Sequence, residues 1–216
     1  MTIKLQQEDI KKIMSQLATV FNQEKNLLND LDSKIGDADH GLSMSRGFNA
    51  IVNYLKEHSD LSITDIFSKG GMQFNEVTGS SIGILIFSAM RSAGLSVKNK
   101  QTIDISDLKS MLAASIEAIQ KRGKASKGQK TILDSMIPTL EYLNNQKNNE
   151  DPKCIREAIK VAHRSAELTK ELESQIGRAR WFKERSIGVM DPGAYTGYLI
   201  IKTIGEYILE RFYNNK

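Results

Sequence analysis

The sequence predicts an all-α protein built as an eight-helix, up-and-down antiparallel bundle or barrel. Apolar residues recur at three- and four-residue steps in eight segments, capping and breaking residues separate these segments, and none alternates as a strand would. The connections are mostly short, which favours antiparallel neighbours. The predicted helices cover residues 7–29, 42–58, 62–77, 82–93, 104–122, 131–145, 152–166 and 192–212.

The first four helices are defined by their apolar faces and by the residues between them. An acidic turn separates the first two helices. The third opens with Ser62 and Asp65, a capping box with Asp in place of the usual Glu. The fourth is apolar on most faces, so we expect it to be central, and we expect Gly94 to end it.

Start and stop signals also mark the last four helices. Gly123 is expected to stop the fifth helix, and Pro138 is expected to kink the sixth or to mark a late start. Asp-Pro pairs at positions 151–152 and 191–192 combine an N-cap residue with proline at the first helical position, so they open the last two helices. A long loop is expected over about 174–190.

Length and composition favour one cytoplasmic domain spanning 1–216. The N-terminal residues lack the apolar core of an export signal, and an apolar run such as Ile84–Phe87 is far too short to cross a membrane. The single cysteine, Cys154, excludes an internal disulfide. A net charge of +4 suits an anionic partner, but scattered basic residues predict neither nucleic-acid nor membrane binding.

The turn between the first two helices is the strongest functional signal. Asp32, Asp37, Asp39 and His40 fall within nine residues, and the carboxylates would repel one another unless a cation neutralised them. Mg²⁺ accepts a few carboxylate oxygens and completes its shell with water or phosphates. An ordinary turn with Asp side chains bonded to the backbone is the alternative, but it does not need three Asp residues. The sequence therefore predicts a metal site formed by Asp32, Asp37 and Asp39.

Two other metal sites do not fit this turn. A calcium-binding EF-hand that began at Asp37 would need Gly and Glu where Leu42 and Phe48 stand. Zinc prefers Cys and His, whereas the chain has one cysteine and three scattered histidines. We therefore expect His40 to be a hydrogen-bond partner of whatever the metal holds, rather than a ligand.

Alternate loops of an up-and-down bundle share one end, so four unusual loops are expected to meet at one pole. Thr78–Ser81 places free backbone N–H groups at a helix start, which suits phosphate, although a simple helix cap is the alternative. Residues 123–131 form a basic, glycine-bearing loop, which is not a P-loop because its spacing differs and no strand precedes it. Arg178 offers a guanidinium for phosphate. Together with the acidic turn, these loops predict a Mg-nucleotide cradle.

An ordered set of short motifs runs along nearly the whole chain. It consists of Leu31-Asp32, Ile35 to Gly41, Met44, Arg46 to Phe48, Arg122 to Ala125, Gly128, Lys130-Thr131, Asp134, Gly177 to Ala179, Glu184 to Gly188 and Asp191 to Ala194. With these motifs the chain resembles the nucleotide-binding L subunit of bacterial dihydroxyacetone kinase of the type linked to the phosphotransferase system.

The resemblance implies an eight-helix barrel that binds ADP or ATP at one pole. Asp32, Asp37 and Asp39 would hold two Mg²⁺ ions. The ketose would sit on a separate K subunit, and a phosphocarrier M subunit would rephosphorylate the bound ADP; such a transfer needs positioning and electrostatics rather than a nucleophile on this chain. The nucleotide-binding positions implied are His40, Gly41, Ser43, Gly79, Ser80, Ser81, Gly123, Gly128, Thr131, Ile132, Arg178, Asp191, Pro192 and Gly193.

Five places depart from the family pattern. Thr78–Gly83 replaces Gly-Gly-Ala-Ser-Gly-Pro, Gln129 replaces an acidic residue, Ile132 replaces Met, Ser43 replaces Asn, and Arg-Trp-Phe-Lys at 180–183 replaces Ser-Tyr-Leu-Gly. The metal triad is intact, so we expect Mg-nucleotide binding to persist, whereas base contacts, affinity and partner recognition are expected to differ from the family pattern.

The departures keep a second interpretation open. The chain could be an L-like paralogue that acts as a nucleotide-dependent regulatory module and binds a transcriptional regulator or a K-like partner without turnover. The related domain of fatty-acid kinases fits less well, because His40 follows Asp39 where Thr is expected and we expect no fused second domain. The ketose, the route by which ADP is recharged and the formation of a homodimer stay open.

Overall fold

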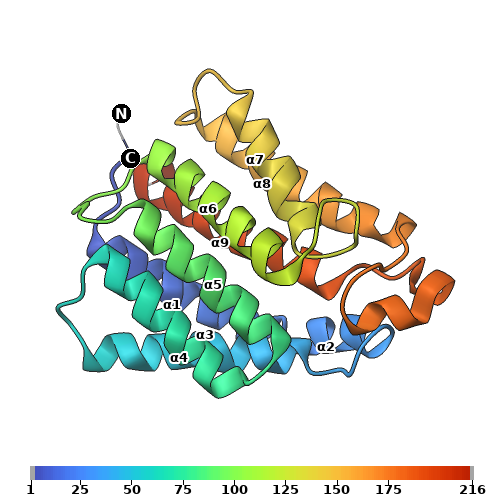
Figure 1. Cartoon of the computed structure of the whole chain (residues 1–216). Coiled ribbons are helices and arrows are strands. Elements are labelled where there is room, and N and C mark those ends of the chain that lie inside the picture. The colour runs from blue at the N-terminus through green and yellow to red at the C-terminus, as the bar shows by residue number, and fades with distance from the viewer. Residues whose placement is uncertain (1–2, 215–216) are drawn as a thin grey trace. The chain divides into compact units, whose positions relative to one another are not determined.

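A computed structural model describes residues 3–214, and it is almost entirely helical (Figure 1). The β pairing within these residues is an isolated antiparallel bridge between Leu5 and Ile103, so the predicted all-α class is confirmed. No helix in the described part of the chain is both long enough and apolar enough to span a membrane.

The chain folds as two compact units. Unit 1 contains Met1–Gln23 and Ser43–Gly123, and unit 2 contains Glu24–Leu42 and Lys124–Lys216. Each unit has buried apolar side chains of its own. The prediction of a single domain stays a prediction.

Unit 1 is a set of packed helices. It contains α1 (Gln7–Gln23), most of α3 (His40–Glu57), α4 (Ile63–Thr78), α5 (Ser81–Ser96) and α6 (Ile105–Gly123). Helix α5 lies between α4 and α6 (Figure 1). The Ser62 hydroxyl accepts a hydrogen bond from the Asp65 N–H at 3.0 Å, which confirms the predicted cap of α4.

Three phenylalanines form an aromatic cluster in the core of unit 1. The rings of Phe21 and Phe48 stack with their centroids 4.8 Å apart. The rings of Phe48 and Phe74 meet edge to face, with their centroids 5.4 Å apart. Gly47 allows this packing, because a Cβ there would lie 2.3 Å from the Phe74 ring. The apolar faces predicted for α1, α3 and α4 therefore meet in one core.

Gly94 does not end its helix, so that prediction is wrong. Helix α5 continues to Ser96, and a Cβ at Gly94 would lie only 2.8 Å from the Cβ of Phe67 on α4. Glycine is present because the two helices approach closely. Ile82 and Leu85 are half-buried, so α5 buries mainly one face.

Unit 2 is organised around α9 (Pro192–Leu209), which packs against α2 (Lys25–Ser33), α7 (Leu133–Asn144) and α8 (Pro152–Leu168). A buried cluster of Leu31, Ala166, Met190 and Ala194 joins α2, α8 and the start of α9. The predicted N-caps are confirmed, since the carboxylates of Asp151 and Asp191 accept hydrogen bonds from N–H groups in the first turns of α8 and α9. Short segments complete the unit: η1 (Thr169–Glu171), η2 (Arg178–Ser186) and η3 (Glu210–Asn214).

Three boundaries differ from the prediction. The expected helix 7–29 breaks at Glu24 (φ −84°, ψ 0°), which adds a ninth α-helix to the described residues. No breaking residue marks this point; the helix breaks because Phe21 packs in unit 1 and Leu31 in unit 2. Pro138 lies inside α7 and does not mark its start. The expected loop 174–190 contains η2, which has no apolar periodicity to reveal it.

Candidate functional site

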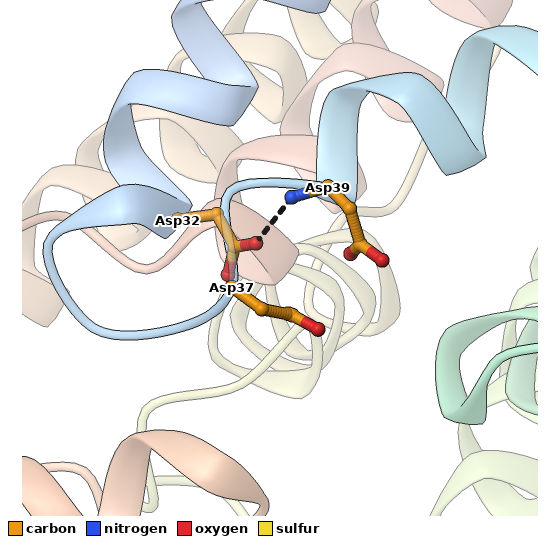
Figure 2. Close-up of side chains that lie close together, drawn as sticks. All are labelled: Asp32, Asp37 and Asp39. Carbon is orange, nitrogen blue, oxygen red and sulfur yellow. Dashed lines mark hydrogen bonds between the residues drawn. The ribbon is translucent and has the colours of Figure 1, made fainter.

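The three aspartates of the acidic loop gather as predicted. Asp32 lies near the end of α2, Asp37 lies in the loop and Asp39 directly precedes α3, and their side chains lie together (Figure 2). One carboxylate oxygen from each lies within 4.8 Å of the others. The Asp32 carboxylate also accepts hydrogen bonds from the N–H groups of Asp39 and His40 at 3.0 and 3.3 Å. This donor set of closely spaced carboxylates fits a hard cation such as Mg²⁺.

Two glycines hold the loop in this conformation. A Cβ at Gly36 would lie 2.2 Å from an oxygen of the Asp32 carboxylate. A Cβ at Gly41 would lie 2.0 Å from the backbone oxygen of Lys25, and the Asn29 side chain accepts the Leu42 N–H beside it at 3.1 Å. The loop is therefore held by close backbone contact between α2 and the first turn of α3.

His40 connects the acidic loop to α9. Its Nε2 lies 2.8 Å from the Oγ1 of Thr196 in a hydrogen bond. Burial lowers the pKa of His40 to about 4, so the imidazole is neutral near pH 7. A neutral ring orients a ligand by a hydrogen bond and adds no positive charge.

Arg178 lies at the edge of the same loop. Its guanidinium forms an ion pair with the Asp37 carboxylate, and both side chains are largely open to solvent. An exposed pair of this kind adds little stability. The pair therefore holds Arg178 beside Asp37 only weakly.

The loop before α7 folds around Asp134. This carboxylate accepts hydrogen bonds from the N–H groups of Gly128 and Thr131, and Gly128 has the left-handed φ of +87°. The buried Ile132 lies against α9, because a Cβ at Gly193 would be 3.1 Å from the Ile132 nitrogen. Thr131, Ile132 and Gly193 are thus brought together, as predicted.

Lys130 ties this loop to the segment that precedes α9. Its side chain is almost fully buried, with 2% of the residue exposed, and its ammonium donates to the backbone oxygens of Leu172 and Ser186. Burial lowers the pKa of Lys130, and nearby Asp191 partly offsets this effect. Burial likewise raises the pKa of Asp191 to about 7.

Replacing Lys130 by methionine is expected to lower the free energy of unfolding by about 2 kcal/mol, because two buried carbonyl oxygens would lose their donor. Chemical denaturation measures the change. Lys127→Met is the matched control in the same loop; Lys127 is exposed and pairs with Glu141, so we expect a loss below about 1 kcal/mol. Equal losses in the two variants would contradict the role given to Lys130.

Five predicted site residues belong to unit 1. Gly79 ends α4 with a φ of +54°, and the Ser80 hydroxyl caps α5 by accepting the Gly83 N–H at 3.3 Å. Ser81 is the first residue of α5, Ser43 is buried in α3, and Gly123 is the last residue of α6. The helix-cap interpretation of Ser80 is therefore realised. The convergence of these five residues with the acidic loop stays a prediction.

Sequence reasoning gave no site role to Lys130, Asp134, Thr196 or Asn29. Lys130 and Asp134 do stand in the motifs of the resemblance, so their positions were marked but their function was not. Thr196 and Asn29 lie in ordinary helical sequence, and their contacts with residues 40–42 appear only in the tertiary structure.

Comparison with protein families now gives the identity of the fold. The model of the DAK2 domain matches residues 34–206. The chain belongs to the DAK2 domain family. The resemblance found in the sequence motifs is thereby confirmed.

Two bacterial relatives of this DAK2 protein are similar over most of their length. The ADP-binding subunit DhaL of PEP-dependent dihydroxyacetone kinase 1 from Listeria innocua is 35% identical, over 82% of this chain and 85% of the relative. The corresponding DhaL subunit of Escherichia coli is 32% identical, over 89% of this chain and 92% of the relative.

A solved structure shares the fold. The crystal structure of the dihydroxyacetone kinase from C. freundii in complex with AMP-PNP and Mg²⁺ matches with a TM-score of 0.73 at 22% identity. The match covers 95% of this chain but only 35% of that chain, so this DAK2 protein corresponds to about a third of the larger kinase.

Proposed function

We propose that this chain is the ADP- or ATP-binding phosphoryl-donor subunit of a kinase that acts on dihydroxyacetone or a related short ketose. The acidic triad carries the proposal, because it occurs in a chain similar over most of its length to subunits that are named as ADP-binding. The regulatory alternative is not favoured, because these relatives are named as kinase subunits.

Asp32, Asp37 and Asp39 hold Mg²⁺ in this proposal, as two ions. The bound metal neutralises and orients the phosphates. His40 donates a hydrogen bond to a phosphate oxygen, and Arg178 moves from Asp37 to a phosphate oxygen. The remaining nucleotide contacts come from Gly41, Ser43, Gly79, Ser80, Ser81, Gly123, Gly128, Thr131, Ile132 and Asp191 to Gly193.

The chain acts with partner subunits in the cytoplasm. Its relatives are named as subunits of PEP-dependent kinases, which supports a multi-subunit system. The ketose is held on a K subunit, and a phosphocarrier M subunit rephosphorylates the ADP. This chain therefore carries the nucleotide and supplies no nucleophile of its own.

The nucleotide content of the purified protein tests the proposal. After denaturation, chromatography of the released small molecules should show about one ADP per chain, and exhaustive dialysis against EDTA beforehand should remove it, because the triad binds the phosphates through metal. A protein that is empty and also fails to bind added Mg-ADP would contradict the assignment.

A further inference from the structure

The segment Arg178–Ser186 presents a tryptophan to solvent beside the acidic loop. Trp181 is 70% exposed, although a large aromatic side chain is usually well covered. The segment has Arg178, Arg180, Lys183 and Arg185 against one acidic residue, Glu184. The mechanism assigned to the site uses only Arg178, so the tryptophan and the other basic residues have no role in it.

The aromatic rings of this segment are held by arginines. The guanidinium of Arg180 lies 4.7 Å from the centre of the Trp181 ring, and that of Arg185 lies 5.5 Å from the Phe182 ring. Such cation–π pairs restrict both rings, of which Trp181 is exposed and Phe182 is half-buried. Lys183, between Phe182 and Arg185, has a φ of +49°, a conformation that residues other than glycine rarely adopt.

The end of the segment is fixed within unit 2, and its start lies beside the acidic loop. At the start, Arg178 pairs with Asp37 of the acidic loop. At the end, the buried Ser186 hydroxyl accepts the Ser174 N–H at 2.9 Å and donates to the backbone oxygen of Lys183 at 2.6 Å. The backbone oxygen of Ser186 also accepts from Lys130. The exposed indole is therefore preorganised, which lowers the entropy cost of binding a partner.

We propose that Trp181, with Arg180 and Arg185, is the anchor by which this subunit docks the protein subunit that carries the phosphoryl acceptor. The inference rests on the proposed function. The acceptor must approach the phosphates at the acidic loop, and Arg178 places the segment at the edge of that loop. Trp and Arg dominate the energetics of protein interfaces. The partner would hold the indole in a pocket. Because the segment is basic, the surface around that pocket should be acidic.

Trp181 allows a direct test by fluorescence, because it is the only tryptophan in the sequence. Mg-ADP is added to the isolated protein, and quenching of the tryptophan emission by acrylamide is measured before and after. We expect the indole to stay equally accessible. Protection of the indole by Mg-ADP alone would overturn the proposal and assign Trp181 to the adenine.

Binding to the ketose-carrying subunit of the same organism provides the second test, with Mg-ADP present. Calorimetry should show that Trp181→Ala raises the dissociation constant about 30-fold. Trp181→Tyr should restore most of the lost affinity. Replacing Arg180 and Arg185 by glutamine should reduce the salt dependence of binding. Lys160→Ala on α8 is the charge control, because Lys160 is exposed and its ammonium pairs with Glu157 in its own helix; its binding should match that of the wild type.

Two outcomes would reject the docking role. One is unchanged affinity of Trp181→Ala for the ketose-carrying subunit. The other is that the wild type binds vesicles with 30% phosphatidylserine, whereas Trp181→Ala does not bind them and keeps its affinity for the ketose-carrying subunit. This result would assign the segment to a membrane surface. The ADP content distinguishes failure of the docking proposal from failure of the proposed function. If the wild type retains ADP but docking does not depend on Trp181, only the anchor is rejected. If the wild type contains no ADP, the proposed function is rejected.

Discussion

Asp37→Ala is expected to weaken the binding of Mg-ADP by at least about 100-fold, because it removes one of three carboxylates that hold the metal against the phosphates. Helicity should be unchanged, since Asp37 lies in a loop and its side chain is 45% exposed. The metal-free variant should unfold with nearly the wild-type free energy, because the exposed pair with Arg178 adds little. Calorimetry and circular dichroism measure these quantities.

Two further variants separate metal binding from the ion pair. Asp39→Ala leaves the pair between Asp37 and Arg178 intact, and it should lose Mg-ADP to the same extent. Asp30→Ala is the matched control, because Asp30 is an exposed carboxylate on α2 outside the triad. Wild-type affinity for Mg-ADP in Asp37→Ala would remove the metal assignment.

The second large effect is expected at Gly41. Gly41→Ala should lower the free energy of unfolding by about 3 kcal/mol, at the upper end of the usual range for overpacking. The added Cβ would meet the backbone oxygen of Lys25 at 2.0 Å, and a backbone atom in a helix cannot rotate away. Relief requires α2 to separate from the first turn of α3, which would also displace the acidic loop and weaken metal binding.

Gly188→Ala is the control for this substitution. Gly188 has a φ of +89°, and a Cβ there would meet nothing within 4 Å. Alanine at this position is therefore destabilising only through backbone strain. That strain costs about 1–2 kcal/mol. Urea denaturation of both variants compares the two costs. A loss at Gly41 no greater than that at Gly188 would show that α2 and α3 are not in the close contact described.

The helices and the metal triad could be predicted because their signals are local. Hydrophobic periodicity and the caps at Ser62, Asp151 and Asp191 depend on residues a few positions apart, and the structure confirms these caps. Asp32, Asp37 and Asp39 lie within eight residues, so one tight loop is enough to bring their carboxylates together.

Gly94 and Glu24 show where local signals are insufficient. Glycine commonly ends a helix, but it also allows two helices to touch, and only the packing of Phe67 on Gly94 distinguishes these roles. At Glu24 the sequence continues without a breaking residue, and the helix ends because its two sides join different cores.

The sequence by itself determined the all-α class, the main helices and the carboxylates that gather in the acidic loop. Tertiary structure alone decided that Arg178 reaches Asp37, that His40 meets Thr196 across 156 positions, and that Lys130 is buried against Leu172 and Ser186. The physical reason is the separation in sequence between the residues that interact. Periodicity and capping follow from neighbouring residues, whereas contacts between distant residues follow from how whole helices pack.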